Sequence, residues 1–283
     1  MIKEWISSYS PQNEEDVLAA MREIMQEIVL AGLSRTDFFE KAAFYGGTAL
    51  RIFHNLGRFS EDLDFSLVRK DPDFSLAPYF DAIVEEFKAL GITVTIQEKQ
   101  KSLQKTIDSA FLKSETLWQE IIFESSLSKT ALPNNRPLKI KLEIDCNPPL
   151  GFETEELLLL RPFSFYVKCF SPSYLFAGKM HALLFRKWKN RVKGRDWYDL
   201  EWYIKSGIAL NTHHFLLRAQ ESGDWRQKKI TQTQIIELLK HKIEEVSFPR
   251  VKDDVVKFIK DDASLQIWSS DYFLHLIKHL KFE

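Results

Sequence analysis

The chain has 283 residues, of which 45% are hydrophobic and 13% aromatic. This composition predicts a packed core and excludes a disordered protein. The formal net charge of −1 excludes a global field that would attract nucleic acid, so any RNA contact has to come from a local basic face. The length suits one large domain or two small ones.

The sequence gives no sign of secretion or of a membrane anchor. Its two cysteines, Cys146 and Cys169, lack the spacing of a metal site and are expected to be free thiols in a reducing compartment. No apolar stretch approaches the roughly 20 residues of a membrane span, and no basic segment with a following apolar run opens the chain. We therefore expect a cytoplasmic protein.

In chain order, the apolar residues of the first 170 positions follow helical spacing in some segments and strand-like alternation in others. An irregular polar segment is expected over 1–13. Helical spacing predicts helices over 13–31, where Gly32 is expected to end the helix, and over 35–41, 49–56 and 76–90. Alternating or β-branched runs predict strands over 43–45, 62–67, 92–96, 118–124, 138–145 and 163–170.

After Ser171-Pro172 the apolar period becomes helical and remains so. Helices are expected over 173–187, 196–207, 212–219, 231–246, 252–259 and 270–279. The sequence thus predicts a mixed α/β domain over 1–170 and a helical domain over 171–283.

A glycine turn lies between the strand at 43–45 and the following helix. Gly46 and Gly47 lack a Cβ, so backbone N–H groups can approach a phosphate closely. Thr48 follows at the start of the helix, where free N–H groups and the helix dipole favour an anion. The turn is therefore a candidate phosphate site, although an ordinary loop would have the same composition.

Two carboxylates lie on the next strand. Asp62 and Asp64 are two residues apart, so they share one face of the strand while Leu63 points to the other. Two hard oxygen ligands opposite a phosphate site suit Mg²⁺ with a nucleoside triphosphate. The alternative interpretation is a solvated strand face.

These residues carry a family resemblance. Gly-Gly-Thr, a short helix and Asp-x-Asp resemble the DNA polymerase beta-like nucleotidyltransferase superfamily. The longer strings Gly-Gly-Thr-Ala-Leu-Arg and Arg-Phe-Ser-Glu-Asp-Leu-Asp-Phe are similar to the AbiEii/AbiGii branch, the toxins of type IV toxin–antitoxin and abortive-infection systems. The resemblance implies a polymerase-beta-like core with a small mixed sheet, and a helical C-terminal region that completes the cleft.

The resemblance also implies a reaction and partners. It implies Mg²⁺-dependent transfer of an NMP from an NTP to an acceptor, with RNA such as a tRNA 3′ end as the first candidate. An AbiEi-like antitoxin would be encoded alongside. Two alternatives are a protein or small-molecule acceptor, and a nucleotide-binding module without catalysis.

The superfamily uses a third carboxylate, which holds a second metal or deprotonates the nucleophile. Glu143 and Asp145 share the polar face of the strand at 138–145, so either could supply it. The resemblance favours Glu143 and leaves Asp145 open. A solvated face with Lys–Glu pairs is the alternative.

A second group of motifs lies in the helical region. In AbiEii-like proteins a helical lysine and an Arg-Asp-x-x-Asp turn are hallmarks, and here they correspond to Lys179, Asp196 and Asp199. Lys179 is suited to neutralise a triphosphate or the leaving pyrophosphate. The two aspartates could orient it through an ion pair, or could contact the sugar or base. The structural alternatives are a surface lysine, a helix cap and an intrahelical partner. The basic run over 186–195 could contact a nucleic-acid backbone.

Overall fold

The computed structural model describes residues 1–98, 116–123, 138–186 and 192–283. The predicted strand end at Glu124 and the central residues 187–191 of the basic run lie outside the described residues. The chain divides into two compact units. We call residues 1–55, 59–150 and 154–169 the sheet unit, and residues 56–58, 151–153 and 170–283 the helical unit.

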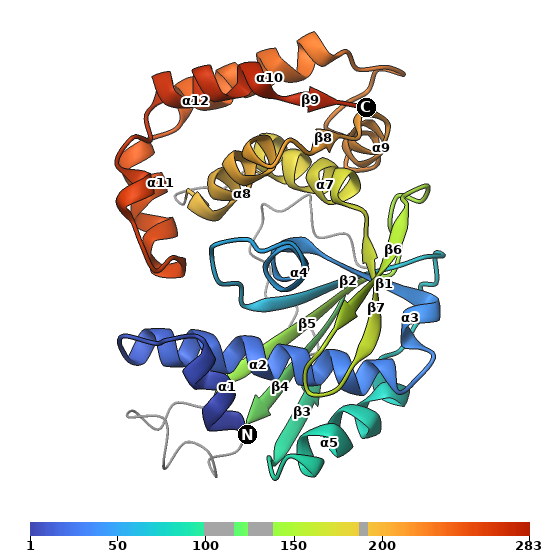
Figure 1. The fold of residues 1–283 in the computed structure, drawn as a ribbon. Coiled ribbons are helices and arrows are strands. Elements are labelled where there is room, and N and C mark those ends of the chain that lie inside the picture. The colour runs from blue at the N-terminus through green and yellow to red at the C-terminus, as the bar shows by residue number, and fades with distance from the viewer. Residues whose placement is uncertain (99–115, 124–137, 187–191) are drawn as a thin grey trace. The chain divides into compact units, whose positions relative to one another are not determined.

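The sheet unit is built on a seven-stranded mixed sheet in the order β3-β4-β5-β2-β1-β7-β6 (Figure 1). Strand β2 pairs with β1 in antiparallel and with β5 in parallel orientation, which places it at the centre of the sheet. The strands are β1 (Ala42–Tyr45), β2 (Asp62–Leu67), β3 (Val94–Glu98), β4 (Thr116–Phe123), β5 (Lys139–Asp145), β6 (Thr154–Leu159) and β7 (Phe165–Phe170).

Helices of this unit pack on the sheet and complete its core. Phe65 of β2 lies at the centre, with ring centroids 5.0 Å from Phe38 and 5.2 Å from Phe44. Long helix α2 runs along the sheet with α5 beside it (Figure 1). The helices are α1 (Ile2–Ser8), α2 (Glu14–Ser34), α3 (Phe38–Lys41), α4 (Gly46–Phe53) and α5 (Phe80–Ala89), the last preceded by a 3₁₀ turn (Ala77–Tyr79).

Two predictions for this unit are wrong. Gly32 does not end α2, which continues to Ser34. A Cβ on Gly32 would lie 2.6 Å from the Cα of Ile83, so the glycine permits close packing of α2 on α5. The N-terminal segment is a helix instead of irregular chain, because Trp5 and Ile6 of α1 pack against the core.

The helical unit consists of α7 (Pro172–Phe185), α8 (Gly194–Lys205), α9 (Thr212–Glu221), α10 (Gln232–Glu245), α11 (Phe248–Val255) and α12 (Ser270–Leu276), with 3₁₀ turns at Val256–Phe258, Ala263–Leu265 and Ile277–His279. Helix α7 packs against α8 and α9, and α8 packs against α11. Two short parallel strands, β8 (Ala209–Leu210) and β9 (Lys281–Phe282), pair beside the helices.

Aromatic side chains form much of the core of the helical unit. Phe273 has ring centroids 5.2 Å from Trp197 and 4.9 Å from Phe248. Helix α11 begins at Phe248, four residues before the predicted start, because Pro249 is compatible with the first turn of a helix. No helix in the described part of the chain is long and apolar enough to cross a bilayer.

Candidate active site

The register of β2 and β5 aligns the acidic residues of the sheet unit. Asp64 lies opposite Glu143, and Asp145 lies opposite Ser66. Asp62 lies opposite Lys141. Neighbouring strands are about 4.8 Å apart, so the backbones of Asp64 and Glu143 are adjacent. The alternate residues, including Leu63, Phe65, Leu142 and Ile144, are fully buried, so the carboxylates share the opposite face as predicted.

The glycine turn lies directly against this face. Gly46 has a φ of +84°, a conformation that side chains with a Cβ rarely adopt. A Cβ at Gly46 would lie 3.1 Å from Cγ of Asp64, and closer still to its Oδ2. The turn therefore requires glycine for its backbone conformation and for the space that the Asp64 carboxylate occupies. Gly47 follows in the first turn of α4.

Thr48 connects the glycine turn to the carboxylate strand. Its side chain is fully buried, and its hydroxyl donates a hydrogen bond to the main-chain carbonyl of Asp62. The hydroxyl thus holds the start of β2 against α4. This contact positions Asp62, while a role of the Thr48 backbone in phosphate binding stays a prediction.

The two candidates for the third carboxylate differ in their surroundings. Glu143 forms an ion pair with Lys141, and both side chains are partly exposed. Asp145 accepts a hydrogen bond from the main-chain N–H of Asn147 at 3.2 Å, which holds the turn after β5. The alternative interpretation expected Lys–Glu pairs on this face, and the Lys141–Glu143 pair is one of this kind, formed within β5. Glu143 is therefore aligned with Asp64, whereas Asp145 stabilises a turn.

These carboxylates suit a hard divalent cation by their chemistry. Their oxygens come from one face of adjacent strands, and the space above Gly46 admits the Asp64 carboxylate. As the side chains stand, no three His, Cys, Asp or Glu residues among those described converge to hold a metal ion. Glu143 forms an ion pair with Lys141 in this arrangement, so its carboxylate has a cationic partner on its own strand.

The helical unit contains a second charged cluster, formed by Arg58, Lys179, Asp196 and Asp199. Arg58 forms a bidentate ion pair with Asp199, with both nitrogen–oxygen distances at 2.6 Å. The Nζ of Lys179 lies 2.8 Å from Oδ1 of Asp196 and 2.8 Å from Oδ2 of Asp199. Arg58 comes from the segment 56–58, which belongs to this unit.

The four groups neutralise one another inside the unit. Arg58 is 2% exposed, Asp199 0% and Lys179 16%. Burial opposes the charge on Lys179, but Asp196 and Asp199 outweigh it and raise the pKa of its ammonium group. Burial likewise opposes ionisation of Asp196, yet Lys179 and neighbouring cations lower the pKa of its carboxyl group to about 2. All four groups are therefore charged at neutral pH.

The contacts in this cluster bear on the alternative that Lys179 is a surface lysine. The expected ion pairs of Lys179 with the two aspartates are present, so Lys179 is no ordinary surface lysine. Arg58, which the sequence left as either structural or phosphate-facing, forms a buried ion pair with Asp199, a partner that the sequence did not identify. The one available signal was its place in the Arg-Phe-Ser-Glu-Asp-Leu-Asp-Phe string. A catalytic role for Lys179, Asp196 or Asp199 stays a prediction.

Comparison with protein families identifies the chain. The model of the AbiEii nucleotidyl transferase toxin of type IV toxin–antitoxin systems matches residues 28–277. The chain belongs to the AbiEii family. It is therefore a nucleotidyltransferase of a toxin family, for which an NTP substrate and an antitoxin partner are implied.

Solved structures share the fold of this AbiEii protein. MenT4, a nucleotidyltransferase toxin from Mycobacterium tuberculosis H37Rv, matches with a TM-score of 0.59 and 16% identity, over 98% of this chain and 88% of that one. A candidate nucleotidyltransferase from H. pylori matches with a TM-score of 0.50 and 20% identity, over 92% of this chain and 91% of that one. None of the curated proteins matches the chain.

The basic run of the AbiEii protein is only partly described. Arg186 and Lys193 line a pocket of the helical unit. Arg195 instead stacks on Phe258, with its guanidinium carbon 4.1 Å from the ring centroid. The run therefore does not form one continuous basic face within the described residues.

Proposed function

We propose that this AbiEii protein transfers an NMP from an NTP to a hydroxyl of an RNA acceptor such as a tRNA 3′ end, with release of pyrophosphate, in a Mg²⁺-dependent reaction. One observation carries the proposal: the register of β2 and β5 aligns Glu143 with Asp64, against a glycine turn that leaves room for the Asp64 carboxylate. Acidic residues on adjacent strands beside a helix N-terminus suit binding of a metal–triphosphate complex.

The acidic residues have separate roles in this proposal. Asp62 and Asp64 hold Mg²⁺, which when bound neutralises charge on the reacting phosphate. Glu143 accepts the proton of the attacking hydroxyl, a role that needs a carboxylate close to Asp64. Alignment with Asp64 supports Glu143 over Asp145, whose carboxylate holds the turn at Asn147.

The remaining residues either bind the triphosphate or hold a residue that does. Backbone N–H groups of Gly46, Gly47 and Thr48 contact its phosphates at the N-terminus of α4. Lys179 neutralises the charge that develops on the phosphate oxygens, and Asp196 and Asp199 hold its ammonium group in place. The last two are positioning residues in this scheme.

We place this chemistry in the toxin of a type IV pair that acts in the cytoplasm and restrains growth or aborts phage infection. An AbiEi-like antitoxin encoded alongside is the proposed partner. The family match supports the toxin class.

A labelling experiment tests the proposal. The purified protein is incubated with each α-labelled NTP, Mg²⁺ and total RNA, and wild type is compared with Asp62→Ala/Asp64→Ala and with Glu143→Gln and Asp145→Asn. The matched control is Asp71→Ala/Asp73→Ala, which changes another Asp-x-Asp pair in an exposed loop.

We expect labelled RNA from wild type, from the control and from Asp145→Asn. The Asp62→Ala/Asp64→Ala and Glu143→Gln variants should lose at least about 100-fold in rate, the range that general-base and metal contributions reach. Label on protein or small molecules alone would overturn the RNA acceptor. Full activity of Asp62→Ala/Asp64→Ala would overturn the catalytic site itself.

A further inference from the structure

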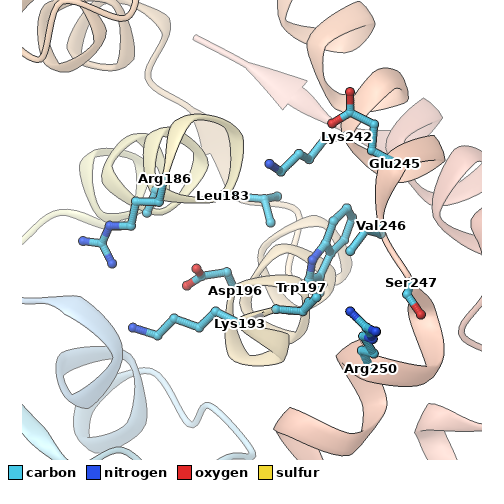
Figure 2. Close-up of a pocket in the computed structure, with 12 residues that line it drawn as sticks. Leu183, Arg186, Lys193, Asp196, Trp197, Lys242, Glu245, Val246, Ser247 and Arg250 are labelled. Carbon is cyan, nitrogen blue, oxygen red and sulfur yellow. The ribbon is translucent and has the colours of Figure 1, made fainter. Parts of the chain in front are cut away.

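A pocket of about 400 Å³ lies within the helical unit, bordered by α7, α8, α10 and α11 (Figure 2). Four cationic side chains line it: Arg186, Lys193, Lys242 and Arg250. Arg186 and Lys193 belong to the basic run over 186–195, and the packing of α10 and α11 adds Lys242 and Arg250, which no local motif connects to that run. Its volume falls in the range of small-molecule sites and exceeds what a single inorganic ion fills.

The pocket has an excess of positive charge. Its two acids are Asp196 and Glu245, and the charge of Asp196 is already paired with Lys179 at 2.8 Å. Within the described residues, Arg186, Lys242 and Arg250 form no ion pair with a carboxylate. Cations gathered at one site repel one another, and a bound anion offsets this repulsion.

The ammonium group of Lys193 is affected by burial and by its charged neighbours. Burial lowers the pKa of its ammonium group to about 8, and the nearby charges of Lys179 and Arg186 act in the same direction, against the opposing effect of Asp196. Burial is thus the main cause of the lowered pKa of Lys193, and neighbouring cations add to it.

Part of the pocket lining is apolar. Leu183 and Trp197 are both buried and line it. The Trp197 ring is held by edge-to-face contacts with Phe248 and Phe273, at centroid distances of 5.3 and 5.2 Å. A ligand that suits this pocket combines a flat apolar group with a phosphate, which a guanidinium group can bind through two parallel hydrogen bonds.

We propose that this pocket binds a nucleotide unit, with its phosphate at the cationic side chains and its base against Leu183 and Trp197. The unit is supplied either by a free nucleotide or by one nucleotide of an RNA strand. The pocket shares Asp196 with the group that holds Lys179 in the scheme above, and its other lining residues have no part in that scheme. The inference does not depend on transfer activity.

Equilibrium binding to the full chain tests the inference. Titration calorimetry without Mg²⁺ uses three kinds of probe: each of the four NMPs, a short single-stranded oligoribonucleotide, and inorganic phosphate. All proteins carry Asp62→Ala/Asp64→Ala, which weakens the proposed primary NTP site. Lys242→Gln/Arg250→Gln is compared with Lys240→Gln/Lys252→Gln, which removes two charges from the same two helices outside the pocket.

We expect Lys242→Gln/Arg250→Gln to raise the Kd for at least one nucleotide probe tenfold or more, with the control within about twofold of the parent. If this variant binds both NMPs and RNA more weakly, the pocket is a site for nucleotides in general. If it binds only RNA more weakly, the bound nucleotide belongs to the acceptor strand. Equal Kd values in both variants, no binding of either nucleotide probe, or binding of inorganic phosphate as tight as that of the nucleotides would overturn the inference. Circular dichroism and thermal unfolding confirm that the variants are folded.

Discussion

Gly46→Ala is the substitution that tests most directly how the glycine turn supports the acidic face. Two effects are expected, one on the stability of the fold and one on the position of the Asp64 carboxylate. The first is backbone strain, because alanine disfavours a φ of +84°. The second is a clash, because the new Cβ meets the carboxylate of Asp64.

The structure allows the two effects to be estimated separately. The left-handed conformation costs a residue with a Cβ about 1–2 kcal/mol. The new Cβ would lie 3.1 Å from Cγ of Asp64, and ordinary contacts begin at 3.4 Å. The carboxylate oxygen is nearer still, so it has to withdraw by roughly 1 Å, a displacement that can reduce a reaction rate about 100-fold. A side chain rotates at little energetic cost, so this second effect concerns activity more than stability.

Gly91→Ala is the matched control in the same unit. Gly91 has a φ of +72°, but a Cβ there would meet nothing within 4 Å. Both variants should therefore lose about 1–2 kcal/mol in urea unfolding, whereas only Gly46→Ala should lose nucleotidyl transfer. The reasoning fails if Gly46→Ala transfers NMP at the rate of Gly91→Ala, or if both lose activity equally.

Two further predictions concern buried charges. Removing one partner of the Arg58–Asp199 pair, by Arg58→Met or Asp199→Leu, should cost about 3–5 kcal/mol in urea unfolding followed by tryptophan fluorescence. The double variant Arg58→Met/Asp199→Leu leaves a neutral Lys179–Asp196 pair, so it should cost clearly less than the sum of the two single losses. The control Glu237→Gln/Lys240→Gln, at an exposed pair, should change stability by under about 1 kcal/mol. Losses that simply add up would refute the energetic coupling of Arg58 and Asp199. Burial raises the pKa of Glu27 to about 7 despite its ion pair with Arg161, so the folded state retains a proton that the unfolded state releases. Stability should therefore fall as the pH rises from about 4.5 to 7, and Glu27→Gln should reduce this dependence; unfolding curves of equal pH dependence would contradict it.

Local periodicity predicted most of the sheet. The alternation over β5 places Ile140, Leu142 and Ile144 in the core and the charged residues on the other face, as observed. This succeeds because one residue of shift would expose every apolar side chain of the strand. Strand β6 escaped prediction because Thr-Glu-Glu-Leu-Leu-Leu also suits a helix, and its pairing in the sheet outweighs that propensity.

Choices that depend on distant residues stayed open. Whether Glu143 or Asp145 faces Asp64 follows from the register of two strands that are far apart in the sequence, and no local pattern contains that register. The pocket of the helical unit is a similar case, since Arg186, Lys242 and Arg250 are brought together only by helix packing.

The string from Arg58 to Phe65 shows why spacing alone could not assign every residue. In the sequence it is one motif, but the structure divides it between two units: Arg58 belongs to the helical unit, and Asp62 and Asp64 to the sheet unit. Arg58 neutralises Asp199, which would otherwise be a buried carboxylate shared with Lys179 alone. Because Arg58 carries part of that charge, Lys179 lies between two aspartates in a cluster without net charge. The arginine of the motif thus acts on the lysine, while its aspartates form the acidic face, and a substitution at either end is expected to affect transfer through a different physical cause.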